Sequence, residues 1–164
     1  MINLSHEEGC APIYKTINSA CADVFAKEDT YLPALTISGH GDQAQDIIMP
    51  PVILVPTGLR IVSVQLDQYK GTFVPELQLR ARSGLSAEGI MLANGMGTID
   101  ADYRQEILVP LMNMSNKAIT IKRGESIAQI TLGLRAKLYS ATTEEVERSG
   151  GFGSTDKKID IIRP

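Results

Sequence analysis

Short apolar runs, and runs in which apolar and polar residues alternate, recur along the chain, each bounded by Gly, Pro or Asn. Alternation with a period of two is typical of β-strands that bury one face, and a helical period is almost absent. The pattern predicts five strands, over residues 61–66, 76–82, 107–112, 118–122 and 127–134. Many short strands at this spacing indicate an all-β barrel or sandwich.

Within these strands, individual residues predict finer features. Leu77, Leu79 and Ala81 share one face of 76–82, with the charged residues on the other face. Pro110 has no N–H to donate, so it predicts a sheet edge or a bulge. Arg123-Gly124-Glu125 predicts the turn between the last two strands.

The remaining segments predict one short helix, a surface loop and a flexible C-terminal arm. The helix is expected over Ser83–Glu88 with Ser83 as its cap. The polar, Gly- and Pro-punctuated stretch from Leu32 to Pro56 predicts a loop, and the sequence assigns no role to its Ser38–Asp46 part. Because the chain becomes Gly-rich after Arg148, we divide it into a β domain, 1–147, and a flexible arm, 148–164.

Composition narrows the class of protein. The chain has 164 residues, 43% hydrophobic and 21% charged, as expected of one globular domain. A net charge of −3 argues against direct nucleic-acid binding, but a small anionic ligand remains possible. Two cysteines without zinc-site spacing favour a reducing compartment. No basic-then-apolar leader and no apolar run of about 20 residues is present, so we expect a soluble cytoplasmic protein that does not bind membranes.

Four segments carry candidate chemistry, and each is ambiguous alone. Asn94-Gly95 predicts a hairpin, and Gly97 would let backbone approach a ligand. Asp100 and Asp102, beside Tyr103, are either solvated turn residues or include a carboxylate that activates water near an aromatic platform for a sugar. Arg82-Ser83-Gly84 at a helix start is either an ordinary cap or a phosphate seat. Residues 150–155, Gly-Gly-Phe-Gly-Ser-Thr, are either a linker or a lid.

Taken in order, five segments resemble the motifs of the trimeric dUTP diphosphatase (dUTPase) family. They are residues 20–26, 82–85, 94–104, 124–129 and 150–155. The resemblance extends from Ser19 to Thr155; its third and fifth motifs are highly specific, whereas the first and fourth are weak alone. It implies a jelly-roll-like β-barrel or sandwich, the dUTPase-like β-clip, in a homotrimer whose active sites are shared between subunits.

The resemblance also implies a reaction, the hydrolysis of dUTP to dUMP and pyrophosphate. This activity keeps uracil out of DNA and supplies dUMP for thymidylate synthesis. Asp100 is implied as the catalytic residue, which orients the water that attacks the α-phosphorus. Tyr103 would pack beneath the deoxyribose and exclude a 2′-hydroxyl. Asp23 would hold Mg²⁺ through a water molecule.

The other substrate-binding positions implied by the resemblance fall into three sets. Uracil would be held by Asn94, Gly97, Thr98 and Ile99, whose backbone copies the pairing edge of adenine. The phosphates would be contacted by Arg82, Ser83, Gly84 and Gln129. The arm would close over the bound nucleotide with Arg148, Phe152, Gly153, Ser154 and Thr155.

The chain departs from the family pattern at four places. Cys21 and Ala22 precede Asp23 where Gly and an aromatic residue are usual. Gln105 stands where Gly is usual, and Ser126 stands where Arg is common, so a cation is lost there unless Arg123 supplies it. Arg148 lies one residue closer to the Gly pair than is usual, so either it reaches from there or Glu147 occupies the Arg position.

Two alternative functions compete with hydrolysis of dUTP. A dCTP deaminase-like enzyme shares the fold but needs a catalytic glutamate and usually lacks the Gly-Phe-Gly arm. A non-catalytic, nucleotide-binding regulatory trimer is disfavoured by the presence of Asp100 with a complete third motif.

Overall fold

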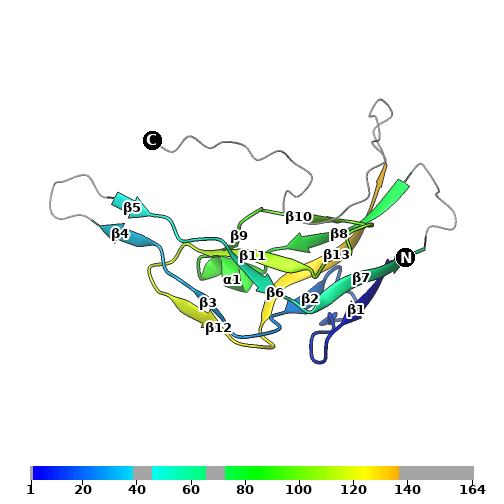
Figure 1. The fold of residues 1–164 in the computed structure, drawn as a ribbon, viewed down its shortest axis with the longest axis horizontal. Helices are drawn as coiled ribbons and strands as arrows, with labels where there is room; N and C mark the ends of the chain where they lie inside the picture. Colours follow the sequence, from blue (N-terminus) through cyan, green and yellow to red (C-terminus); the bar gives the residue numbers. More distant parts are fainter. Residues whose placement is uncertain (1, 39–45, 66–72, 137–164) are drawn as a thin grey trace.

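The computed structural model describes residues 2–38, 46–65 and 73–136 of the chain. This part is nearly all β, with one short helix, as the sequence pattern predicts (Figure 1). The elements are β1 Ile2–His6, β2 Ala22–Phe25, β3 Thr30–Leu32, β4 Thr36–Ser38, β5 Asp46–Ile48, β6 Ile53–Pro56, β7 Leu59–Val64, β8 Phe73–Arg80, α1 Ser83–Ala87, β9 Ile90–Leu92, β10 Gly97–Asp100, β11 Leu108–Asn113, β12 Ile119–Ile121 and β13 Ser126–Ala136.

Two antiparallel sheets form the body of the molecule. The larger has the strand order β10-β8-β13-β2, and the smaller has the order β6-β11-β9. The 11-residue β13 joins β8 to β2, pairing with β8 from Gln129↔Arg80 to Ala136↔Phe73. Three further two-stranded pairs, β1–β7, β3–β12 and β4–β5, complete the described strands (Figure 1).

The core is aliphatic and draws on both sheets. Val24, Val55, Leu59 and Val109 have exposed fractions of 0%. Alternate residues of β7 are buried and exposed, as a strand that covers a core on one face requires. Burial of each such side chain contributes roughly 1.5–3 kcal/mol, which makes this core the main stabilising feature.

The face of β8 that was expected to be solvated is partly buried. Leu77 and Leu79 are buried as predicted, but Gln78 is also only 2% exposed, and Ala81 lies beyond the strand and is exposed. Gln78 is satisfied, because it donates to Glu76 and accepts from Arg80 Nη2 at 2.7 Å. β8 lies between β10 and β13, so long side chains cover this face instead of water.

Pro110 does not mark a sheet edge. It lies in β11, the central strand of the smaller sheet, opposite Leu54. Its carbonyl accepts the Ala93 N–H at 2.8 Å, and a residue's N–H and C=O point to the same neighbour in an antiparallel ladder. The position where another residue would have an N–H therefore faces Ala93, just past the end of β9 at Leu92. The proline costs the sheet a single hydrogen bond there.

Two other local predictions need correction, and one is confirmed. The helix begins at Ser83, but its capping residue is Arg82, which makes no side-chain capping bond. The stretch expected as a loop between Leu32 and Pro56 contains the β4–β5 pair and β6, because its apolar residues pair across Ile37↔Ile47. The turn at Gly124 is confirmed by a φ of +82°.

The described residues contain no helix that is long and apolar enough to cross a membrane. The C-terminal arm and the centre of the Ser38–Asp46 segment lie outside the described residues.

Candidate active site

The turn at Asn94-Gly95 connects the two main sheets. Gly95 has a φ of +68°, and its N–H donates to the Leu92 carbonyl at 2.9 Å, as a tight turn requires. The flanking strands do not pair with each other, because β9 pairs with β11 and β10 pairs with β8. The predicted turn is therefore present, but the predicted hairpin is wrong: an Asn-Gly signal specifies the turn and not the partner of each strand.

Gly97 is tightly packed. It lies opposite Leu79, and a Cβ at this position would come within 3.1 Å of Asn94 Nδ2 and 3.2 Å of Leu79 Cβ. A side chain at this position would need Asn94 or Leu79 to shift by a few tenths of an ångström. Thr98 is exposed and Ile99 is half-buried in the strand that follows.

Asp100 ends β10 at the surface, next to an anchored tyrosine. Its carbonyl accepts the Tyr103 N–H at 3.0 Å, which closes a turn in which Asp102 is also exposed. The Tyr103 ring is 8% exposed and belongs to the core, and its hydroxyl donates to the Glu106 carbonyl at 3.1 Å. Arg104 Nη1 donates to the Ala101 carbonyl at 2.7 Å. The segment thus joins an exposed aspartate to an anchored aromatic residue through one tight turn.

A second cluster brings together residues of the first, second and fourth motifs. Asp23, 2% exposed, lies opposite Gln129, whose Nε2 donates to Asp23 Oδ1 at 3.0 Å. The other carboxylate oxygen, Oδ2, lies 3.7 Å from Arg82 Nη2 and 4.0 Å from Lys15 Nζ. Burying a carboxylate requires such compensation.

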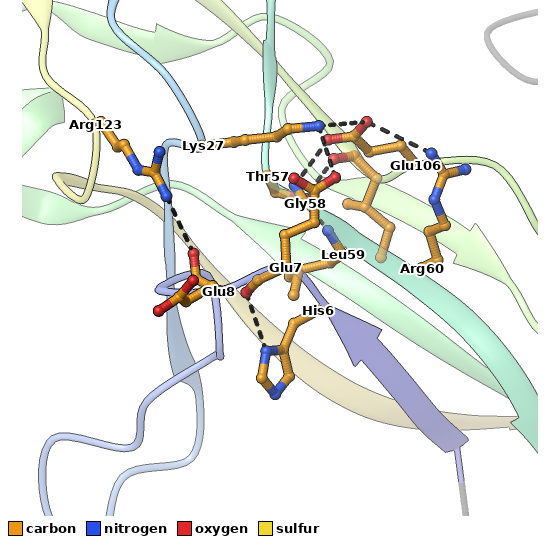
Figure 2. A network of polar contacts seen from close by, with 11 residues as sticks. His6, Glu7, Glu8, Lys27, Thr57, Gly58, Leu59, Arg60, Glu106 and Arg123 are labelled. Carbon is orange, nitrogen blue, oxygen red and sulfur yellow. Dashed lines mark hydrogen bonds and ion pairs between the residues drawn. The ribbon is translucent and has the colours of Figure 1, made fainter.

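Ser126 in the fourth motif contacts an arginine of the second motif. Arg82 Nη1 donates to the Ser126 carbonyl at 3.0 Å, so Arg82 bridges the first and fourth motifs. The Arg123 guanidinium donates to the Glu8 carbonyl at 3.3 Å (Figure 2). Ser83 and Gly84 are exposed at the start of α1.

The residues around Asp23 fit a metal held through water. Asp23 Oδ2 is buried and has no hydrogen-bond partner in the described part of the chain, so it is available to accept from a bound water. Residues 2–38, 46–65 and 73–136 contain no group of three or more His, Cys, Asp or Glu that could form a protein-only cage. One outer carboxylate, with phosphates and waters as the direct ligands, suits Mg²⁺, which keeps several of its waters.

Sequence reasoning missed Glu76 as a neighbour of the site. Glu76 lies opposite Asp100 in the β8–β10 ladder, and paired residues point to the same face of a sheet. Hydrogen bonds from Gln78 and Arg135 hold the pKa of Glu76 below its ordinary value of 4.5. The signal was the alternation Glu76, Gln78, Arg80 along one strand face.

The residues of the fifth motif lie outside the described part of the chain. They are Arg148, Phe152, Gly153, Ser154 and Thr155, together with the neighbouring Glu147.

Comparison with known proteins identifies relatives over most of the chain. The family model described as dUTPase matches residues 8–156. A deoxyuridine 5'-triphosphate nucleotidohydrolase from Wolbachia sp. subsp. Brugia malayi is 39% identical over 155 residues, covering 89% of this chain and 85% of the relative. One from Cytophaga hutchinsonii is 39% identical over 150 residues, covering 87% and 91%.

Solved structures share the fold. The dUTPase from Streptococcus mutans aligns with a TM-score of 0.62 at 22% identity, covering 85% of this chain and 98% of that chain. A point mutant of the phage 80alpha dUTPase aligns with a TM-score of 0.60 at 18% identity, covering 94% and 98%. These likenesses confirm the predicted jelly-roll-like β fold. Because the family model matches residues 8–156, the chain belongs to the dUTPase family.

Proposed function

We propose that this protein hydrolyses dUTP to dUMP and pyrophosphate, with Asp100 as the catalytic residue. Family membership and the 39% identity to two named nucleotidohydrolases support the reaction. The observation that carries the assignment of Asp100 is its place at the exposed end of β10, three residues before an anchored Tyr103. An exposed carboxylate on a rigid strand can hold a water in one orientation.

The chemistry is an in-line displacement at the α-phosphorus. Asp100 orients a water and accepts its proton as the new oxygen–phosphorus bond forms. The bond from the α-phosphorus to the oxygen bridging to the β-phosphorus breaks, and its electron pair leaves with pyrophosphate. The α-phosphate remains on dUMP.

Selection of the base and sugar rests on the turn and strand that precede Asp100. Backbone groups of Asn94, Gly97, Thr98 and Ile99 would pair with the uracil edge, so cytosine would leave donors unpaired. The Tyr103 ring would lie beneath the deoxyribose and leave no room for a 2′-hydroxyl. Only 8% of Tyr103 is exposed, so the sugar would contact one edge or face of a ring that is otherwise held in the core.

The phosphates would be bound by Arg82, Ser83, Gly84 and Gln129. The Arg82 guanidinium is already oriented by Ser126 and Asp23, which limits the entropy lost on binding an anion. Asp23 would hold a water of Mg²⁺, with Gln129 fixing its carboxylate. When bound, Mg²⁺ neutralises charge on the triphosphate.

Assembly as a homotrimer with shared sites would complete the pocket. Leu54 in β6 and Met91 in β9 are 43% and 52% exposed in the smaller sheet, and Leu132 in β13 is 54% exposed. Apolar exposure on sheet faces supports burial against another subunit. In this assembly the arm would close over the nucleotide with Phe152 on uracil and Arg148, Gly153, Ser154 and Thr155 at the phosphates.

The free thiols Cys10 and Cys21 suit a reducing cytoplasm.

A panel of dUTP, dCTP, dTTP and UTP with Mg²⁺, scored for pyrophosphate and ammonia, tests the proposal. We expect pyrophosphate from dUTP far faster than from the other three. Ammonia from dCTP would instead support the deaminase, and tight binding of dUTP without turnover would support the regulatory trimer.

A further inference from the structure

The position of Tyr103 depends on a residue outside the proposed contacts. Its hydroxyl donates to the backbone carbonyl of Glu106 at 3.1 Å, and its N–H donates to the Asp100 carbonyl. The residue is therefore held at both ends, with its backbone fixed by the Asp100 turn and its hydroxyl fixed by the backbone at Glu106. What fixes Glu106 also fixes the tip of the ring.

Glu106 is fixed through its side chain. The carboxylate is 18% exposed, and its Oε1 accepts the Gly58 N–H at 2.8 Å. Oε2 lies 3.7 Å from Lys27 Nζ and 3.8 Å from Arg60 Nη2 (Figure 2). A hydrogen bond to a charged acceptor is about twice as strong as a neutral one. The two cations lie beyond hydrogen-bond range, so the Gly58 bond provides the geometry.

Thr57 fixes Ile107, the residue after Glu106. Its side chain is fully buried, and its hydroxyl donates to the Ile107 carbonyl at 2.6 Å while accepting the Leu59 N–H at 3.2 Å. The Ile107 N–H in turn donates to the Leu59 carbonyl at 2.8 Å. Three hydrogen bonds thus join Glu106-Ile107 to the turn Thr57–Leu59, and we call these residues the junction.

The Gly58 side of the junction is itself rigid. Gly58 has a φ of +69°, and a Cβ there would come within 3.1 Å of Cys10 Sγ. The Gly58 carbonyl accepts the Glu7 N–H at 3.1 Å. The N–H that Glu106 accepts is therefore presented by a backbone that has little freedom to move.

We propose that Glu106 is a positioning residue that sets sugar specificity through Tyr103. The inference rests on the proposed function, since it requires Tyr103 to lie beneath the deoxyribose. Without the Glu106 carboxylate, the junction loses its bond to the Gly58 N–H, and residue 106 is held only through its neighbour Ile107. The acceptor of the Tyr103 hydroxyl is then less firmly fixed. The ring then gains the freedom to yield to a 2′-hydroxyl.

The test compares Glu106→Ala with Glu106→Gln by the ratio of kcat/KM for dUTP to that for UTP. Glu106→Ala should lower this ratio about tenfold, the low end of the discrimination that a pocket gains by excluding one small group. Glu106→Gln keeps an oxygen that accepts the Gly58 N–H, so it should keep the ratio within about twofold. Glu7→Ala is the matched control, because it removes the 2.7 Å ion pair to Lys27 and leaves the Glu106–Gly58 bond intact; its ratio should equal that of the wild type.

A double-mutant cycle with Tyr103→Phe separates positioning from general loss of stability. If Glu106 acts through the Tyr103 hydroxyl, Glu106→Ala should lower the ratio little further in the Phe background. Losses that multiply independently would overturn the inference. If Glu106→Ala does not fold, Tyr103→Phe decides alone: an unchanged ratio overturns the inference, because Glu106 is proposed to act through that hydroxyl.

Failure of this inference differs from failure of the proposed function. If the wild type releases no pyrophosphate from dUTP, the proposed function is wrong. Suppose instead that the wild type prefers dUTP and that Tyr103→Ala lowers the ratio of kcat/KM for dUTP to that for UTP. If Glu106→Ala then leaves this ratio unchanged, only the role of Glu106 is wrong.

Discussion

Asp100 and Asp102 are both exposed and lie two residues apart, yet the structure gives them different positions. Asp100 is the last residue of β10, whereas Asp102 lies in the turn that follows. The backbone of a strand residue in a ladder is fixed, so its side chain leaves the sheet in a defined direction. A carboxylate that orients a water needs such a fixed position. Asp100→Asn should therefore lower kcat by about 10²–10⁴-fold while dUTP still binds. Single-turnover pyrophosphate release and calorimetric binding measure the two effects.

Asp102→Asn is the control for this prediction. It removes a carboxylate of equal charge from the same turn and should leave kcat within about threefold of the wild type, since surface changes are usually small. Near-normal turnover by Asp100→Asn, or equal loss in both variants, would contradict the assignment of Asp100.

For single residues, the sequence predicts the local backbone conformation better than it predicts contacts between distant residues. The positive φ at Gly95 and Gly124 follows from turn chemistry, and the structure has both. The contact between Asp23 and Gln129 was not predicted, because it joins residues 106 positions apart through the register of β2 with β13.

Among the strands, β8 shows why alternation predicts only half of an element's environment. Alternation specifies which residues share a face, but not whether that face meets water. Gln78 is buried because Glu76 and Arg80 hydrogen-bond to it along the strand, and because Gly133 in β13 leaves room beside Glu76 and Gln78. The hairpin at Asn94-Gly95 and the sheet edge at Pro110 were wrong predictions for a related reason, since both depend on which strand lies alongside.

The Glu76 carboxylate should make the stability of this sheet depend on pH. Hydrogen bonds from Gln78 and then Arg135 lower its pKa in the folded state below 4.5. A lowered folded-state pKa stabilises the protein above the unfolded-state value, and that contribution is lost as pH falls through the folded-state value. Glu76→Gln should therefore lower Tm at neutral pH, with a difference from the wild type that shrinks as pH falls below 4.5.

Thermal melts from about pH 7 to about pH 3 test this prediction. Glu88→Gln, at the exposed C-terminal end of α1, is the control and should track the wild type throughout. A Tm difference for Glu76→Gln that stays constant or grows on acidification would contradict the prediction.

For the whole molecule, the all-β class followed from short alternating runs, but the sheet order did not. β13 pairs with β2 and with β8, which begin about a hundred and about fifty residues earlier. Such pairing depends on packing of the complete core and leaves no local trace in the sequence. The jelly-roll arrangement was predictable only through the resemblance to dUTPases.

The arm after Glu147 should be dispensable for folding and necessary for rate. Residues 148–164 are polar and Gly-rich, with little apolar surface to stabilise a core. Deleting them should leave Tm and the assembly mass nearly unchanged but lower kcat strongly, because Phe152 no longer shields uracil and water enters. Full activity of the deletion would contradict the lid, and a monomeric deletion would show that the arm is structural.

Point substitutions in the arm distinguish the two readings of the shifted arginine. If Arg148 reaches the γ-phosphate, Arg148→Ala should approach the defect of the full deletion. If it does not, Arg148→Ala should be mild while Phe152→Ala remains severe. Steady-state kcat and KM for dUTP decide between them.

Sharing of sites between subunits predicts complementation between two inactive chains. Asp100→Asn has an intact arm, and the 148–164 deletion has an intact Asp100. If a site takes Asp100 and the arm from different subunits, random mixed trimers contain active sites in which both are intact. At equal amounts of the two chains, about a quarter of the sites should be active, since each of the two positions is filled correctly half the time. Co-expression followed by dUTP turnover measures this fraction. Activity no higher than the sum of the separate variants would show that one subunit supplies both.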